Sequence, residues 1–501
     1  MGIPSYFRGI LIKYPSCLVR SVEVPSALAL DFNCLIYRCI NQPSMPVYSI
    51  ETHEEWEAML LKEIEKTVKE IWTYAGKPKN VLLAVDGVVP MAKIRQQRVR
   101  RFKSVWLRQF KTGVSWDTNA ITPGTEFMEK LGIMLKKNKS WIVSGVDEEG
   151  EGEHKIMNWL RRSRSPLEGR TGFASEASES ERKSVVVYGL DADLILLSML
   201  TGESCGLNLF LLREKQEFGH KTAQQEYQYL NIREFQARLG LVGYDAVLNY
   251  IGYMSLMGND FLPHSLTHKL SDDGHEFVMG CLKEESNLIV DGKVSLTVLK
   301  GVFERWSSND QEEDRLLYLI RKKRETKAAG NDELALKWDV EAALLDSKKL
   351  KDDWKLKDDW KKVYWNFLHR SHDINHICEE YLKGFQWIID YYTGKPVNTS
   401  WIFPAWLPPL WSDLATFLND HEPSLEIYGG EPSPTPEEQL AMVLPLESWG
   451  LIKNTNLRRL PVLAPQMWPK IFGFVSLGRK WLWECEARIP VLTVERVRAV
   501  G

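Results

Sequence analysis

The sequence is poor in cysteine, and its few cysteines follow no ligand spacing. Seven cysteines are scattered over 501 residues, and no C-x-x-C occurs. An odd, scattered set argues against a disulfide framework and a cysteine zinc site, and it indicates a reducing compartment. We expect a cytoplasmic protein, with nuclear residence left open.

Long apolar runs and an excess of one charge are also missing. No run reaches the ~18 apolar residues of a transmembrane helix, and the N-terminus has no apolar signal region. We therefore expect a soluble chain without membrane contact, acting as a monomer. Lys and Arg number 64 and Asp and Glu 67, so the net charge is −3. This sum excludes a chain that is basic all over, but it leaves room for a local basic patch.

What is present first is an alternation of apolar runs and helical patterns. Three runs, 27–30, 81–85 and 185–188, are each followed by acidic residues, and helical patterns at 54–74 and 153–162 lie between them. Buried parallel strands have this character. The pattern predicts an α/β fold, with a mostly parallel central sheet flanked by helices. Ligands of such sheets bind beyond the carboxyl ends of the strands, where these acids fall.

The rest of the chain differs in composition. We expect a first domain at 1–290 with a mobile polar loop at 163–184, and a charged helical connector at 291–362. A second, helical and aromatic-rich region is expected at 363–501, packed on the first. A hexapeptide, KLKDDW, occurs at 349–354 and again at 355–360, and we interpret it as a duplication in a solvated helix. A β element is expected over 480–494.

Seven acids form the candidate site: Asp31, Asp86, Glu151, Glu153, Asp191, Asp193 and Asp260. So many carboxylates in one cleft would raise one another's pKa, and divalent cations would make them tolerable. Oxygen ligands suit Mg²⁺ or Mn²⁺, and two such ions could activate water against a phosphodiester. Each acid alone could instead cap a helix or complement its dipole. His154 and His264 lack a second histidine at ligand spacing, and we interpret both as structural.

The segment 91–111 holds eight Lys and Arg and no acid. Four of its side chains share one helix face and offer donors for a terminal phosphate: Lys93, Gln97, Arg100 and Arg101. The alternative is a solvated charged helix, but such helices usually mix signs.

These segments resemble, in order, the signature blocks of the 5′→3′ exoribonuclease (Xrn) family. The blocks are MGIPSYFRGILIKYP, LALDFN, AVDGVVPMAKIRQQRVRRF, GEGEHKIMNWLR, VYGLDADLILL and GNDFLPH, and the stretch from EEYLKGF to WSDL is similar to the family's second block. The resemblance covers about 1–290 and 363–495. Long C-terminal extensions are missing, which is similar to the compact versions of large DNA viruses.

The resemblance implies a PIN-like or flap-nuclease-like catalytic domain and a processive exoribonuclease. Such enzymes degrade single-stranded RNA from a 5′-monophosphate end, with Mg²⁺ held by the seven acids and the phosphate held by the four residues of the basic segment. It also implies a base stack, for which Tyr37 stands where the family has His, and Trp401 is the partner. Two alternatives stay open: a flap-type DNA nuclease and a catalytically silent RNA-binding protein.

Tryptophan is the last unusual feature. Of 19 tryptophans, 11 lie in residues 354–501. We assign core packing to Trp387, Trp406, Trp411, Trp481 and Trp483, because they lie in apolar company. Trp354 and Trp360 of the repeated hexapeptide are assigned to one helix face.

Overall fold

A seven-stranded sheet forms the base of the fold. The computed structural model describes residues 6–23, 25–110, 113–163, 182–214, 226–270, 273–308, 311–328, 341–346, 355–368, 373–479 and 482–500. The strand order is β1-β7-β6-β5-β2-β3-β4. The five strands from β6 to β4 are parallel, whereas β7 runs antiparallel to both β6 and β1.

The strands of this sheet are β1 Leu18–Val19, β2 Ala27–Asp31, β3 Asn80–Ala84, β4 Ile142–Ser144, β5 Ser184–Tyr188, β6 Asn208–Glu214 and β7 Tyr227–Asn231. The helices up to residue 328 are α1 Tyr6–Lys13, α2 Phe32–Ile40, α3 His53–Tyr74, α4 Met91–Arg108, α5 Glu126–Lys137, α6 Gly152–Arg162, α7 Asp193–Cys205, α8 Ile232–Leu239, α9 Gly243–Leu256, α10 Gly274–Glu284, α11 Leu296–Ser307 and α12 Gln311–Ala328. Beyond them come α13 Trp360–Leu368, α14 Ile374–Thr393, α15 Trp411–Asp420, α16 Pro436–Val443, α17 Thr455–Arg458, α18 Leu460–Leu463 and α19 Val494–Val500, with the short pairs β8 Ile289–Val290 with β9 Lys293–Val294 and β10 Gly473–Val475 with β11 Glu486–Arg488.

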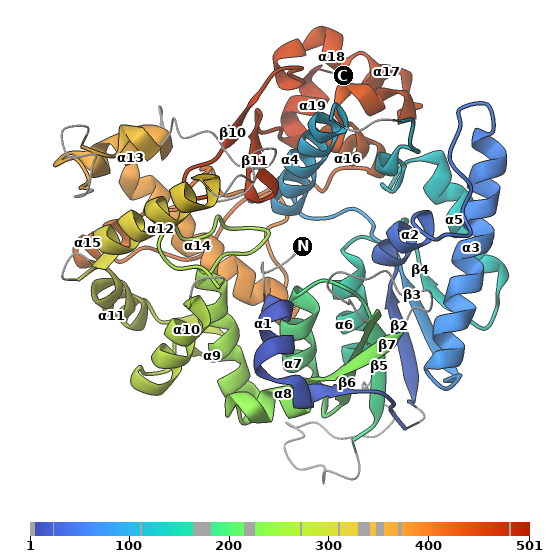
Figure 1. Cartoon of the computed structure of the whole chain (residues 1–501), viewed down its shortest axis with the longest axis horizontal. Helices are drawn as coiled ribbons and strands as arrows, with labels where there is room; N and C mark the ends of the chain where they lie inside the picture. The colour runs from blue at the N-terminus through green and yellow to red at the C-terminus, as the bar shows by residue number, and fades with distance from the viewer. Residues whose placement is uncertain are drawn as a thin grey trace.

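Helices cover both faces of the sheet, as the sequence predicted. Side chains of a strand point alternately to its two faces. In β2, Ala27 and Ala29 pack with α6 and α7, whereas Leu28 and Leu30 pack with α2, α3 and α5. Figure 1 shows α3 and α5 on one side of the sheet and α6 and α7 on the other. The α/β prediction and its three central strands are confirmed.

The helix-rich second region shares a core with the first. One hydrophobic cluster runs from sheet residues such as Ala29 through α9 to Phe303 of α11, Phe385 of α14 and Trp411 of α15. The segment expected as a charged connector thus contributes α11 to this core. Among the helices within the described ranges, none is long and apolar enough to cross a membrane.

The basic segment 91–111 largely forms α4, a helix that is mostly buried. Figure 1 shows α4 among the C-terminal elements α16, α19 and β11. Arg98 is 2% exposed, and its guanidinium donates to the carbonyl oxygens of Met442 and Met467. Lys103 donates to the carbonyl of Cys485 at 2.7 Å. These cations satisfy backbone acceptors of the second region rather than facing solvent.

Two sequence interpretations need correction. The second hexapeptide copy, 355–360, does not lie in a solvated helix, because Leu356 is 1% exposed, pairs with Leu345 in a β-bridge, and precedes α13, which begins at Trp360. Trp406 is half-buried rather than fully in the core, whereas Trp387 and Trp411 are buried as predicted. The first copy at 349–354, most of the loop 163–184, Trp354, Trp481 and the side chain of Trp483 lie outside the described residues.

Candidate active site

Two of the predicted acids meet at the carboxyl ends of adjacent parallel strands. Asp31 ends β2, and Asp86 follows β3. Between them lies Gly152, where an added Cβ would come within 2.8 Å of Asp31 Oδ1 and 3.4 Å of Asp86 Oδ1. The Gly152 N–H donates to Asp86 Oδ1 at 2.7 Å. A glycine is required here because the first turn of α6 enters between the two carboxylates.

A buried lysine joins two further acids. Lys93 Nζ lies 2.5 Å from Glu151 Oε2 and 2.7 Å from Asp260 Oδ2. Burial alone would lower the pKa of Lys93, but these carboxylates raise it well above its usual value. Burial likewise works to raise the pKa of Asp260, but Lys93 lowers it. Lys93 therefore stays charged and bridges α4, α6 and the loop after α9.

Three of the acids, Asp31, Glu153 and Asp193, have a raised pKa. Burial and the charge of Asp86 raise the pKa of Asp31 well above its usual value. Burial and Glu151 do the same to Glu153, whose Oε2 has no hydrogen-bond partner among the described residues. Burial and Asp260 raise the pKa of Asp193, the first residue of α7, to about 7.

This donor set fits divalent cations. One Asp193 oxygen is buried without a partner in the described structure, as is Glu153 Oε2. Ligand atoms of Glu151, Glu153 and His154 lie within 4.8 Å of one another. Burial lowers the pKa of His154 to about 3, so its imidazole is neutral. Unpaired buried carboxylate oxygens are costly, and a hard cation would satisfy them.

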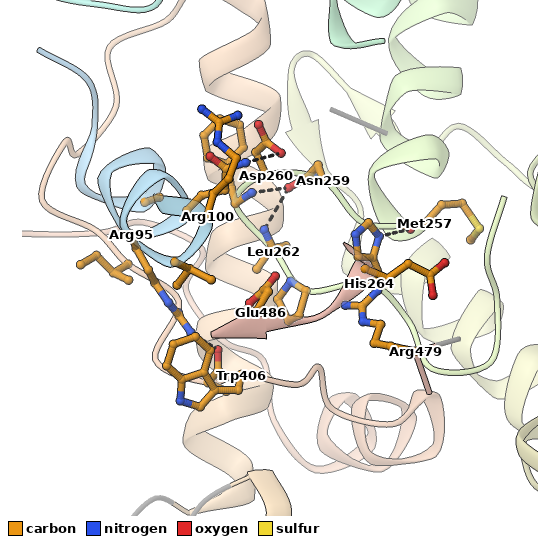
Figure 2. Close-up of a pocket in the computed structure, with 18 of the residues that line it drawn as sticks. Arg95, Arg100, Met257, Asn259, Asp260, Leu262, His264, Trp406, Arg479 and Glu486 are labelled. Atoms are coloured by element: carbon orange, nitrogen blue, oxygen red, sulfur yellow. Dashed lines mark hydrogen bonds between the residues drawn. The ribbon is translucent and has the colours of Figure 1, made fainter. Parts of the chain in front are cut away.

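The predicted phosphate-binding residues are divided between different tasks. Lys93 is paired with acids, as described above. Arg101 is 7% exposed and donates to the carbonyl oxygens of Asn119 and Ile121, each at 3.3 Å. Gln97 is buried, and its side-chain carbonyl has no partner within the described ranges. Arg100 is half-buried beside Asp260 (Figure 2) and forms no hydrogen bond or ion pair with any residue that the structure describes. Phosphate binding by this set stays a prediction.

The two residues predicted to stack on a base differ in exposure. Tyr37 on α2 is 39% exposed. Trp401 is 5% exposed, and its indole N–H donates to Glu380 at 3.1 Å. The ring packs so closely on Gly384 that an added Cβ would come within 2.4 Å of it. The stack stays a prediction, but Trp401 is packed as a core residue.

Several residues that support the acids were not predicted. Tyr391 of α14 donates its hydroxyl to Glu151 Oε1 at 2.8 Å, and its ring centroid lies 3.9 Å from that of His154. Asn33 donates to Asp86 Oδ2 at 2.9 Å. Lys155 donates to the carbonyls of Val85 and Gly145 and ties α6 to the ends of β3 and β4. Asn33 could have been predicted from the sequence, because it stands two residues after Asp31. Tyr391 could not, because it lies 240 residues from Glu151 in the chain.

The sequence of this chain is similar to those of known exoribonucleases. Residues 1–215 match the family model described as XRN 5′-3′ exonuclease N-terminus. The chain is 25% identical to human 5′-3′ exoribonuclease 1 over 99% of its own length and 34% of that protein. It is 30% identical to the Saccharomyces cerevisiae 5′-3′ exoribonuclease 1 over 59% of its length and 21% of that protein. It is 28% identical to the 5′-3′ exoribonuclease 2 of Eremothecium gossypii over 62% of its own length and 41% of that protein. The chain thus spans well under half the length of these relatives.

Proposed function

We propose, from the match of residues 1–215 to the XRN 5′-3′ exonuclease N-terminus, that this chain belongs to that family and degrades single-stranded RNA from a 5′-monophosphate end. The observation that carries the proposal is the set of buried carboxylates at the strand ends, bridged by one lysine. Relatives named 5′-3′ exoribonucleases suggest the direction of degradation and the class of nucleic acid.

We assign the acids to Mg²⁺, with Mn²⁺ as the other fitting ion. Asp31, Asp86, Glu151, Glu153, Asp191, Asp193 and Asp260 would hold two ions, with His154 as a neutral donor at hand. When bound, such ions lower the pKa of water and neutralise the charge on a phosphodiester. The raised pKa values of Asp31, Glu153 and Asp193 support this assignment, because neighbouring cations would favour their charged forms.

The surrounding groups fix the acids in place. Asn33 and the Gly152 N–H hold both oxygens of Asp86, while Tyr391 and Lys93 hold both oxygens of Glu151. Preformed geometry of this kind lowers the reorganisation that a reaction requires. Arg100, which has no partner in the described structure, is the group best placed to meet a terminal phosphate.

Hydrolysis at this site accounts for repeated cleavage. Water adds across the bond between phosphorus and the 3′-oxygen of the first nucleotide, which leaves as a nucleoside 5′-monophosphate with a 3′-hydroxyl. The phosphate stays on the shortened RNA, which again begins with a 5′-phosphate. The same donors can therefore bind the new end after it advances.

One RNA sequence with three different 5′ ends tests the proposal. RNA carrying a 5′-monophosphate, a 5′-hydroxyl or a cap is incubated with the protein, with Mg²⁺ or with EDTA. We expect only the first to be shortened, and only with metal. Asp86→Asn should abolish the loss, whereas Asp420→Asn, at the exposed end of α15, should not. Equal degradation of the three RNAs, or cleavage of 5′-flap DNA in preference to RNA, would contradict the proposal.

A further inference from the structure

A cavity of about 150 Å³ lies beside the acids on a second face of α4. Ala92, Gln96, Val99 and Lys103 line it from α4. Lys93 and Arg101 are not among its lining residues, since they contact Glu151, Asp260 and the 119–121 turn. Its other walls come from the loop 257–270, the segment 402–406 and, near the C-terminus, Arg479, Glu484 and Glu486 (Figure 2). We call it the α4 cavity.

A nearly buried guanidinium faces this cavity without a partner. Arg479 is 9% exposed, and its side chain makes no hydrogen bond or ion pair with any other residue in the described part of the chain. Figure 2 shows it beside His264, whose pKa burial and Arg479 lower to about 3. A neutral imidazole offers no counter-charge. A charge held out of water without a partner is costly, so the position favours an anion.

Arg100 reaches the same cavity from α4, also without a partner among described residues. The remaining cations on the walls are already engaged, since Lys103 and Lys269 donate to carbonyl oxygens and Arg95 does so at two carbonyls. Three acids also line the walls: Asp260 pairs with Lys93, and Glu484 and Glu486 follow Arg479 in the chain. Against them stand five Lys and Arg of the lining, so its net charge is positive. Arg100 near Asp260 and Arg479 near His264 are therefore the lining cations that are left to meet an anion, and Arg is the side chain best suited to phosphate.

An indole completes the lining. Trp406 is half-buried on the cavity wall, and the guanidinium of Arg95 lies 4.5 Å from its ring centroid. Aromatic surface beside cations suits a nucleotide, because stacking of a base on such a ring contributes ~1–3 kcal/mol.

We propose that the α4 cavity binds a nucleoside monophosphate, the class of product that the proposed reaction releases. This inference rests on the proposed function. Asp260 and Arg100 belong both to the reaction site and to the cavity wall, so the two spaces adjoin. A nucleotide that leaves through the cavity does not have to pass back along the incoming RNA.

Equilibrium binding to the metal-free protein tests the site without turnover. Isothermal titration calorimetry uses inorganic phosphate and 5′-AMP as probes, with Arg479→Met as the variant and the exposed Arg496→Met as control. Loss of a charge-assisted hydrogen bond predicts about 10- to 100-fold weaker binding of both probes to Arg479→Met. Any site around Lys93 would bind equally in all three proteins, so the difference isolates the cavity. Unchanged affinity in Arg479→Met would overturn the proposal.

A second variant distinguishes binding of the base from binding of the phosphate. Trp406→Leu should weaken AMP about 5- to 100-fold and leave inorganic phosphate within twofold of the wild type. If it also weakens phosphate to the same degree, the indole does not contact a base and the nucleotide assignment is wrong.

Inhibition kinetics then connect the site to the reaction. AMP should inhibit RNA degradation by the wild type, and the AMP concentration for half-maximal inhibition should rise about 10- to 100-fold in Arg479→Met. Identical inhibition of the two proteins would refute a product site. If the wild type degrades no RNA but phosphate binding still depends on Arg479, the proposed function fails and the anion site stands.

Discussion

Replacing Tyr391 by Phe removes one hydroxyl and keeps the packing of α14 on the acids. The hydroxyl is the donor to Glu151 Oε1 at 2.8 Å, while Lys93 holds the other oxygen. Tyr391 is 9% exposed, so water does not readily replace the lost donor. A hydrogen bond to a charged group contributes ~1.5–3 kcal/mol, and loss of an outer partner of a metal ligand costs ~10–100-fold in metal affinity or activity.

We therefore expect the Mg²⁺ concentration for half-maximal RNA degradation to rise about tenfold, which corresponds to about 1.4 kcal/mol. The KM for RNA should stay within twofold, because Tyr391 holds Glu151 rather than nucleic acid. The assay is a Mg²⁺ titration of the initial rate at saturating 5′-monophosphate RNA, with calorimetric Mn²⁺ binding as a readout independent of turnover. Tyr381→Phe is the matched control, since Tyr381 is fully buried on the same helix and its hydroxyl has no partner among described residues. Equal Mg²⁺ dependence of Tyr391→Phe and wild type would refute the reasoning.

Three further predictions concern the stability of the folded protein. The pKa of Asp193 is raised from 3.8 to about 7 by burial and Asp260, so the folded state binds its proton more tightly than the unfolded state. The contribution of Asp193 to the free energy of unfolding is complete below pH 3.8 and is lost as the pH rises through 7. Thermal melting in EDTA should therefore show a lower stability at about pH 8.5 than at about pH 6. Added Mg²⁺ should reduce this difference in stability between the two pH values. Lys155→Met leaves two buried carbonyls without their donor and should cost about 2–4 kcal/mol in urea unfolding, whereas Lys139→Met on the exposed surface should cost little. Trp401→Ala should cost about 3–5 kcal/mol because its ring is core; a stable variant with weakened RNA binding would instead support the stacking role.

The positions of the acids were predictable because strand periodicity is local. An apolar run that ends in an acid, as at Asp31, places that acid at the carboxyl edge of a parallel sheet, where its neighbours' acids also lie. The packing of Tyr391 and Trp401 was not predictable, since each is determined by partners far along the chain or on another element.

The basic segment shows the same limit more sharply. Its lack of acids indicated a surface that meets phosphate. That prediction stays open, but Arg98 and Lys103 of the same segment donate to carbonyl oxygens more than 300 residues away. Of the Lys and Arg in the described part of the segment, Arg100 is the one without a partner among the described residues. Charge composition reports how many donors a helix carries, but not whether their acceptors are phosphates or backbone carbonyls.

The burial of α4 also determines when, during synthesis, the acid site can be completed. The carbonyl oxygens that accept hydrogen bonds from Arg95, Arg98 and Lys103 belong to residues between 403 and 485. At ~5–20 residues per second, a ribosome makes those acceptors roughly 15–75 seconds after it has made the helix. Until then the cations of α4 lack their interior partners, and Lys93 sits on a helix without its final support. A half-made chain therefore carries its acids before it can align them, and the acid site is completed only after residues 403–485 have been made.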